Sequence, residues 1–307
     1  MPPGGLSVKL ALALLDSGPA SEEDTPVPTI PFHAPGITYN GLDGTTNPTA
    51  TQVAADLATT RQHFSHVRTY YPQYGGGAVD VGKIAKDANL AALLGLFLFD
   101  GHPDWIADNY NQFVKPAPAR GNIAGILIGN EDPQMIDTIT QYLTKAKADL
   151  PSTALGTSQT IDFWLSGGRA SSLLPLVDFI GVNIYPAWDW QHADANNQPI
   201  GVTPEAGFNS FCDTYGRIQS KYQGRQIVVT ETGWPTTFGP IGSPQFPVGI
   251  SNARDYLNRV TAWARAQQVV VYLHNMFDDQ FGVDTSSPFN YHFGLIDSSG
   301  HAKGVLF

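Results

Sequence analysis

Cysteine is almost absent from this chain of 307 residues: Cys212 is the single example, so no disulfide can form within the sequence. A zinc site built from several cysteines is excluded for the same reason. No apolar run reaches the roughly 20 residues that a membrane-spanning helix needs. Basic residues are also few, with 17 Lys and Arg against 27 Asp and Glu. The resulting net charge of −10 argues against nucleic acid or an anionic membrane as a partner.

The first 32 residues differ in composition from the rest. A short apolar stretch at residues 10–15 follows Lys9 and resembles the core of a signal peptide, but no clear cleavage pattern comes after it. Residues 17–31 are rich in Pro, Ser, Glu and Asp, which is typical of a linker. We therefore expect residues 1–32 to be a tail or linker and residues 33–307 to be one catalytic domain.

Short, mostly apolar runs alternate with stretches of helical periodicity along the rest of the chain. The runs lie at residues 36–39, 67–70, 93–99, 125–129, 154–158, 179–185, 227–230 and 269–273. Continuous apolar runs are typical of parallel strands that are buried on both faces. Strands that alternate with helices in this number predict a single (β/α)8 barrel. An open doubly wound sheet is disfavoured, because no Gly-x-Gly-x-x-Gly follows the first run.

Two glutamates stand where apolar runs end. Glu131 follows the fourth run, in the sequence IGNE, and Glu231 follows the seventh, in VVTE. The active site of a (β/α)8 barrel lies at the carboxyl ends of its strands, so both carboxyl groups are expected at the same open end. A carboxylate beside a buried strand is costly. Two such residues, three strands apart, therefore indicate chemistry rather than a chance ion pair.

Four motifs resemble glycoside hydrolase family 17, whose enzymes act on β-1,3-glucan. They are IGNE at 128–131, NIYP at 183–186, VVTETGWPT at 228–236 and FDD at 277–279. The TETGWP element is the most specific, whereas GNE is shared by the whole clan that contains the family. The motifs span the fourth to the eighth predicted strand, and the strand count extends the resemblance over residues 36–307.

The resemblance implies that Glu131 is the general acid/base and Glu231 the nucleophile of a retaining enzyme. In such enzymes two carboxyl groups about 5–5.5 Å apart form and then discharge a covalent glycosyl-enzyme. Glu131 has to be protonated for the first step. We expect burial and the neighbouring charge of Glu231 to raise its pKa.

Four further residues at the strand ends are expected to line the sugar site. The resemblance implies that Asn130 holds the 2-hydroxyl of the reacting sugar, and Tyr185 is positioned to hydrogen-bond Glu231. Tyr39 and Arg68 end the first and second runs and are expected to face the same sugar. For Arg68, a structural counter-ion is an equally good interpretation.

Aromatic and acidic residues in the following loops complete the predicted cleft. Trp234 and Trp188 are candidates for stacking on the C–H faces of sugar rings. Asp278 and Asp279 follow the eighth run, where the family usually has an Asp-Glu pair. Asp279 is therefore one methylene shorter than the family's residue, which leaves open whether a sugar contact is kept there.

No cofactor is expected, and no metal site, because the eight histidines show no ligand spacing with a carboxylate. A phosphate-handling barrel would need glycine-rich loops after the seventh and eighth strands or a strand-end lysine, and neither occurs. A non-catalytic glucan-binding barrel is a further alternative, which the presence of both glutamates opposes.

The glycosyl-enzyme has two possible acceptors. Transfer to a sugar gives a β-1,3-glucanosyltransferase, and transfer to water gives an endo-1,3-β-glucanase. The segments between the third and sixth runs are short, as in compact microbial members of the family, which are often transferases. We therefore expect glucanosyl transfer with some hydrolysis, on β-1,3-glucan and laminari-oligosaccharides. The substrate favours a secreted or cell-wall location, and a monomer is the default expectation.

Overall fold

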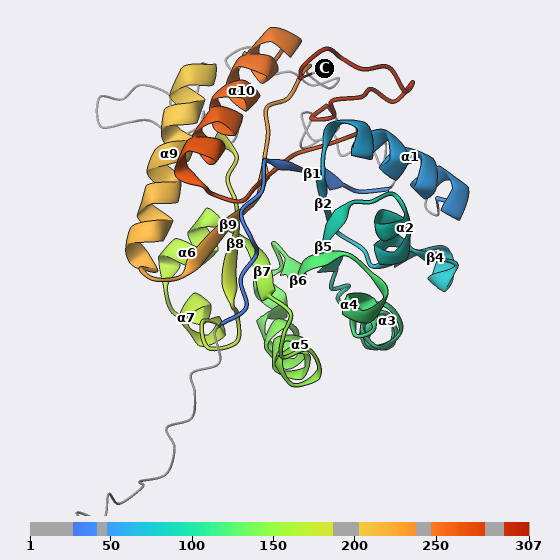
Figure 1. The fold of residues 1–307 in the computed structure, drawn as a ribbon. Helices are drawn as coiled ribbons and strands as arrows, with labels where there is room; N and C mark the ends of the chain where they lie inside the picture. The colour runs from blue at the N-terminus through green and yellow to red at the C-terminus, as the bar shows by residue number, and fades with distance from the viewer. Residues whose placement is uncertain (1–26, 42–47, 187–202, 238–246, 280–291, 307) are drawn as a thin grey trace, which may run out of the picture.

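Parallel strands close into a barrel in the computed structural model, which describes residues 27–41, 48–186, 203–237, 247–279 and 292–306 (Figure 1). In chain order the eight strands are β1 (Gly36–Tyr39), β2 (His66–Thr69), β5 (Ala91–Leu96), β6 (Ile123–Asn130), β7 (Leu155–Thr160), β8 (Phe179–Asn183), β9 (Gln226–Thr232) and β10 (Val271–Leu273). Each overlaps one of the predicted runs, and β1 pairs with both β2 and β10 to close the ring. The (β/α)8 prediction is confirmed.

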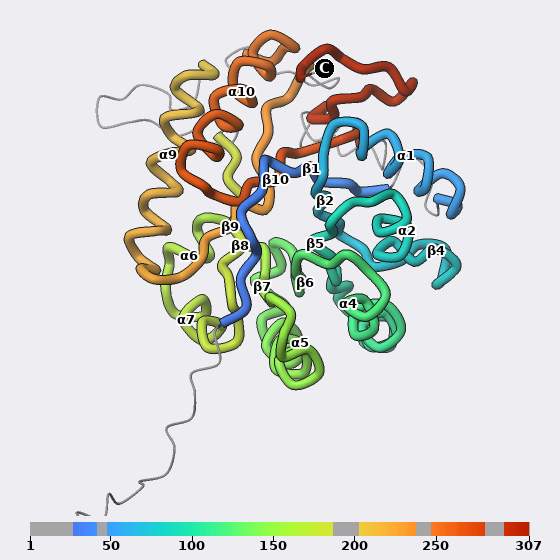
Figure 2. The backbone as a smooth tube through the Cα atoms, viewed as in Figure 1, coloured from blue at the N-terminus to red at the C-terminus, as the bar shows by residue number. Residues whose placement is uncertain are grey.

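Helices surround the barrel, as the ribbon and the tube both show (Figures 1 and 2). They are α1 (Ala50–His63), α2 (Val81–Asp87), α3 (Pro103–Asn109), α4 (Ala117–Arg120), α5 (Ile136–Asp149), α6 (Ile161–Ser166), α7 (Arg169–Leu173), α9 (Pro204–Lys221) and α10 (Ile250–Gln267). Between them lie an antiparallel pair, β3 (Gln73–Tyr74) and β4 (Val79–Asp80), and the single turns η1 (Gly75–Gly77), η2 (Tyr110–Val114) and η3 (Pro133–Met135). None of the helices in the described ranges is long and apolar enough to cross a membrane.

Helix starts and packing faces follow the local sequence. The Thr49 hydroxyl accepts from the Gln52 backbone N–H, and the Gln52 side chain accepts from the Thr49 N–H, which is a complete capping box at the start of α1. At the other end of the chain α9 and α10 lie side by side (Figure 1). The Trp263 indole of α10 meets the rings of Phe211 and Tyr215 edge-on, at 5.2 and 5.0 Å, which joins the two helices through aromatic contacts.

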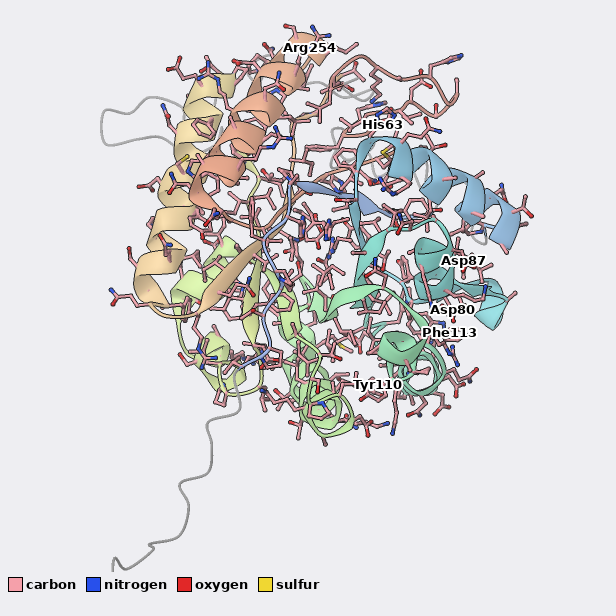
Figure 3. All side chains as sticks on the ribbon, in the orientation of Figure 1. His63, Asp80, Asp87, Tyr110, Phe113 and Arg254 are labelled. Carbon is pink, nitrogen blue, oxygen red and sulfur yellow. The ribbon has the colours of Figure 1, made fainter. Side chains whose placement is uncertain are left out.

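Side chains fill the barrel interior, so the space between the strands is a core and not a pore (Figure 3). Gly156 allows this close packing, because a Cβ there would lie 2.5 Å from the Phe179 ring. Ile30 closes the amino-terminal end: its side chain is 1% exposed, and its backbone N–H and C=O both bond the Gln226 amide, at 2.9 and 2.6 Å. Packing therefore begins before residue 33, where the domain was expected to start.

Candidate active site

Glu131 owes its position to an irregularity at the end of β6. The pairing of β6 with β7 shifts register between Leu127 and Asn130. Gly129 and Glu131 both have positive φ, at +80° and +55°, a conformation that costs a residue with a side chain about 1 kcal/mol. The Glu131 N–H is nevertheless held by the Ser158 carbonyl at 2.9 Å. This kink leaves Glu131 with an exposed face at the open end of the barrel.

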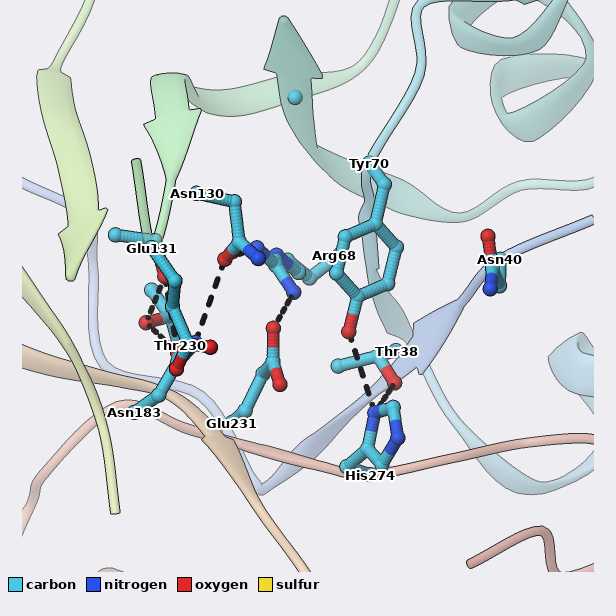
Figure 4. Close-up of polar contacts among 12 residues, drawn as sticks. Thr38, Asn40, Arg68, Tyr70, Asn130, Glu131, Asn183, Thr230, Glu231 and His274 are labelled. Atoms are coloured by element: carbon cyan, nitrogen blue, oxygen red, sulfur yellow. Dashed lines mark hydrogen bonds and ion pairs between the residues drawn. The ribbon is translucent and has the colours of Figure 1, made fainter. Parts of the chain in front are cut away.

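Glu231 lies within β9, and its strand is irregular as well. Register shifts occur on both sides of β9, so Asn183 of β8 is the pairing partner of Glu231 itself. The Glu231 side chain points into the barrel mouth toward Arg68, while the Thr230 side chain also points inward, to Asn183 (Figure 4). Glu231 is 6% exposed, which makes it a buried carboxylate.

The neighbours of Glu231 keep it ionised. Burial alone would raise its pKa, but the Arg68 guanidinium, His274 and the hydroxyls of Tyr185 and Tyr70 outweigh burial and hold the pKa below its usual range. Arg68 donates to Oε1, and the Tyr185 hydroxyl donates to Oε2 at 2.6 Å. Burial keeps the pKa of His274 below its ordinary value, so Arg68 is the cation that matters at neutral pH. Glu231 has the charge state of a nucleophile.

The surroundings of Glu131 favour its protonated form. Desolvation by the surrounding protein and the charge of Glu231 raise its pKa to about 7, although an Asn183 hydrogen bond works against this shift. The Asn183 Nδ2 donates to Glu131 Oε1 at 2.9 Å. The Asn183 Oδ1 accepts from the hydroxyls of Ser158 and Thr230, at 2.9 and 2.7 Å, which fixes the orientation of the amide. Near neutral pH a large share of Glu131 therefore carries a proton.

Asn130 links the two carboxyl groups. Its Oδ1 accepts from Arg68 at 2.7 Å and from Asn183 at 3.3 Å, and these residues in turn bond Glu231 and Glu131 (Figure 4). Since the oxygen of the Asn130 amide is occupied on both sides, its NH2 is the group available to a ligand. This geometry is compatible with the expected contact to a sugar hydroxyl.

A second set of hydrogen bonds orders the proton on Tyr70. Thr38 donates its hydroxyl proton to Asn275 Oδ1 at 3.0 Å, so it accepts from His274 Nδ1, also 3.0 Å away. His274 therefore carries its proton on Nδ1, which also lies 3.2 Å from the Tyr70 hydroxyl. With the ring nitrogen acting as donor, Tyr70 keeps its own proton for Glu231, its other hydrogen-bond partner. Tyr70 also stacks on the Arg68 guanidinium at 3.8 Å.

Activity is expected to depend on pH with a basic limb set by Glu131. The value of kcat/KM should fall as the pH rises through about 7, because the acid is lost, and should persist well into acid, because the pKa of Glu231 lies below its usual range. Initial rates on laminarin between pH 3 and 9 measure both limbs.

Glu131→Gln tests the assignment of that limb. On an aryl glycoside with a leaving group that needs no proton, the variant should retain glycosyl-enzyme formation and lose the basic limb of this step. A basic limb that persists unchanged in Glu131→Gln would show that another group is responsible.

Two aromatic predictions are wrong. Trp234 is 1% exposed: its Nε1 donates to the Pro247 carbonyl at 3.0 Å, and its ring packs on Tyr256 at 5.2 Å, so it has no free face for a sugar. Gly207 of α9 leaves the space that the indole occupies. Tyr39 faces outward and donates to Asp56 of α1 at 2.8 Å, because side chains alternate along β1 and Thr38 takes the inward place.

Arg68 and Asp278 each form an ion pair within the protein, Arg68 with Glu231 and Asp278 with Lys303. Arg68 is 1% exposed and is the counter-ion of Glu231, which decides between the two interpretations considered above. Asp278 is buried, accepts from Lys303 at 2.6 Å and from the Gly294 N–H at 2.9 Å, and so anchors the C-terminal segment. Its role as a sugar ligand stays a prediction, which these internal contacts do not support. Trp188 lies outside the described residues.

Asp279 does lie at the barrel mouth. Its Oδ1 accepts from Asn40 at 2.9 Å and from Asn275 at 3.3 Å, and burial raises its pKa despite the opposing effect of His274. The prediction for Tyr185 is confirmed in one respect: its hydroxyl donates to Glu231 Oε2. Its ring also meets the His274 ring edge-on, with centroids 5.8 Å apart.

Tyr70, Asn183 and His274 were not predicted. Asn183 begins the NIYP motif and Tyr70 ends the second run, so strand-end position was a signal for both. His274 follows β10 directly but carries no motif of its own. Within the described ranges, no group of three or more His, Cys, Asp or Glu is arranged to hold a metal ion.

Comparison with known families gives a match to the BtgE/BtgC glycoside hydrolase domain over residues 36–294. The probable family 17 glucosidase SCW10 of Saccharomyces cerevisiae is 25% identical over 216 residues, which are 66% of this chain and 50% of that protein. The chain thus spans about half the length of this curated relative. The resemblance to glycoside hydrolase family 17 is confirmed.

Solved structures share the fold at low identity. A family 17 β-1,3-glucanosyltransferase from Rhizomucor miehei has a TM-score of 0.68 and 18% identity, with 89% of this chain and 96% of that chain covered. An endo-laminarinase from Formosa has a TM-score of 0.72 and 16% identity, with 89% and 86% covered. A β-D-glucuronidase from Dictyoglomus thermophilum has a TM-score of 0.63 and 14% identity, with 90% and 49% covered.

Proposed function

Because the chain belongs to the BtgE/BtgC glycoside hydrolase domain family, we propose that it is a retaining enzyme of β-1,3-glucan that acts through a covalent glycosyl-enzyme. The observation that carries the proposal is the opposite charge state of two carboxyl groups in one hydrogen-bond network. Glu231 is held ionised, and the pKa of Glu131 is raised to about 7. This is the division that retaining glycosidases need.

In the first step Glu231 attacks the anomeric carbon while Glu131 gives its proton to the departing glycosidic oxygen. The bond to the leaving sugar breaks as the bond to Glu231 Oε forms. Esterification removes the charge of Glu231, and this lowers the pKa of Glu131, whose second-largest perturbation is that charge. Glu131 then acts as base and takes a proton from the incoming hydroxyl. The oxygen of that hydroxyl bonds the anomeric carbon as the bond to Glu231 breaks, which frees the Glu231 carboxylate.

A neutral sugar fits this mouth better than a glucuronide, although glucuronidases share the fold. Among the described residues, Arg68 is the cation that contacts this pair of carboxyl groups. It is buried and already bonds Glu231 and Asn130. An anionic sugar placed beside the ionised Glu231 would meet a like charge, and Arg68 is not free to neutralise it.

For the second step we favour transfer to a glucan hydroxyl, with hydrolysis as the competing outcome and an endo-1,3-β-glucanase as the alternative. The segments between β5 and β8 support transfer. The described residues there form β6, β7, α5 and several shorter helices, and they include no added subdomain. The catalytic domain would comprise residues 33–307 together with the segment around Ile30 that packs on the barrel, and a glucan substrate favours a secreted or cell-wall location.

Product analysis on a single laminari-oligosaccharide tests the proposal. Products longer than the substrate are expected, together with shorter ones, and retention should give the β-anomer first. Shorter products alone would identify a hydrolase. No conversion of laminari-oligosaccharides, together with cleavage of an aryl β-glucuronide, would overturn the substrate assignment.

A further inference from the structure

Four aromatic side chains form a cluster beside the carboxyl pair, which we call the aromatic ledge: Tyr71, Phe97, Phe99 and Trp105. Tyr71 and Phe99 have nearly parallel rings, 19° apart, with centroids separated by 6.0 Å. Phe97 lies 5.3 Å from Tyr71 and 4.9 Å from Phe99, and Trp105 meets Phe99 edge-on at 4.8 Å. None of these residues has a place in the mechanism above.

The ledge stands at the same end of the barrel as the two glutamates. Tyr71 follows Tyr70 just beyond β2, and Phe97 and Phe99 follow β5 directly. Tyr71 also connects the ledge to the site electrostatically: burial raises its pKa to about 12, and the carboxylates of Asp132 and Asp279 add to the shift. Those two acids follow β6 and β10, so they lie at the same end of the barrel as the ledge.

The ledge is not an ordinary core. Phe99 is 36% exposed, and Tyr71, Phe97 and Trp105 are only partly buried. Partly exposed aromatic rings near carboxylates offer two kinds of contact, since the C–H face of a pyranose packs on a ring and its hydroxyls donate to the acids. A protein partner would be expected to bury a wider apolar area than these four rings provide.

We propose that the aromatic ledge is a distal sugar-binding site, which takes a pyranose of the same β-1,3-glucan chain beyond the residue at the carboxyl pair. The inference rests on the proposed function, because it takes the glucan as the occupant of the mouth. Its ligand is a neutral hexose unit. The ledge makes the enzyme favour long chains over short ones.

Phe99→Ala tests this with laminariheptaose and laminaritriose as substrates. The ratio of kcat/KM on the longer substrate to that on the shorter one should fall about tenfold, as expected for one lost stacking contact. Phe99→Tyr, which keeps a ring, should restore the ratio. Phe32→Ala is the matched control, because Phe32 is 42% exposed and lies toward the amino-terminal end of the barrel, and it should leave the ratio unchanged.

An unchanged ratio in Phe99→Ala, or an equal loss on both substrates, would overturn the ledge while the proposed function stands. Wild-type protein that converts neither oligosaccharide would overturn the proposed function and the ledge with it. Thermal melts of each variant separate these results from misfolding, and Phe99→Tyr, which keeps the ring contacts, should change the Tm little.

Discussion

Glu231→Ala is expected to lower kcat on laminari-oligosaccharides by about 10⁴-fold or more, the size of effect found when a catalytic nucleophile is removed. The loss follows from the proposed covalent route, which has no substitute once the carboxylate is gone. Added azide should restore turnover, because the truncated side chain leaves room for a small anion. Azide would attack from the side where Glu231 stood and give the α-glycosyl azide from an activated aryl β-glycoside.

Glu131→Ala provides the contrasting result. Here Glu231 still forms the glycosyl-enzyme, azide attacks that intermediate from the opposite side, and the β-glycosyl azide should appear. Glu205→Ala, an exposed glutamate in the first turn of α9, is the control for a lost carboxylate and should keep full activity. A β-azide from Glu231→Ala would reverse the two roles.

Arg68→Met is expected to cost both stability and activity. Removal of one partner from a buried ion pair typically destabilises a protein by about 3–5 kcal/mol, since the other charge stays buried. Without the guanidinium the pKa of Glu231 should rise, which moves the acidic limb of kcat/KM to higher pH. The pair stabilises the fold while Glu231 is ionised, and this contribution is lost as the pH falls through its depressed pKa. The Tm deficit of Arg68→Met should therefore narrow in acid.

Arg259→Met is the matched control. Arg259 pairs with Asp255 at 3.0 Å on the surface of α10, where both side chains are exposed, and such pairs contribute about 0–1 kcal/mol. Should Arg68→Met fail to fold, Arg68→Lys keeps the charge but not the fork that bonds both Glu231 and Asn130. An acidic limb that stays in place in a folded Arg68 variant would contradict the role of counter-ion.

The strand pattern predicted the barrel because buried parallel strands need continuous apolar runs, which are visible in one dimension. The place of the two glutamates followed from that pattern, since strand ends meet at one edge. Single side-chain directions did not follow. Tyr39 sits one position from the inward Thr38, and a shift of one residue turns a side chain to the opposite face. Trp234 was placed by its distance along the chain from Glu231, but a glycine on α9 admits its ring to the core.

The sequence by itself determined the fold class, the family and the two carboxyl groups near the strand ends, because each depends on residue type and local order. Only the tertiary structure decided where those carboxyl groups point, which residues they bond and which of them is ionised. The positive φ of Glu131 and the register shifts of β9 set where the carboxyls point. Partners distant in sequence, such as Arg68 for Glu231 and Asn183 for Glu131, set their hydrogen bonds. The shift of a pKa depends on the burial of a group and on the charges around it in space. The shifts of Glu131 and Glu231 therefore exist only in the folded barrel.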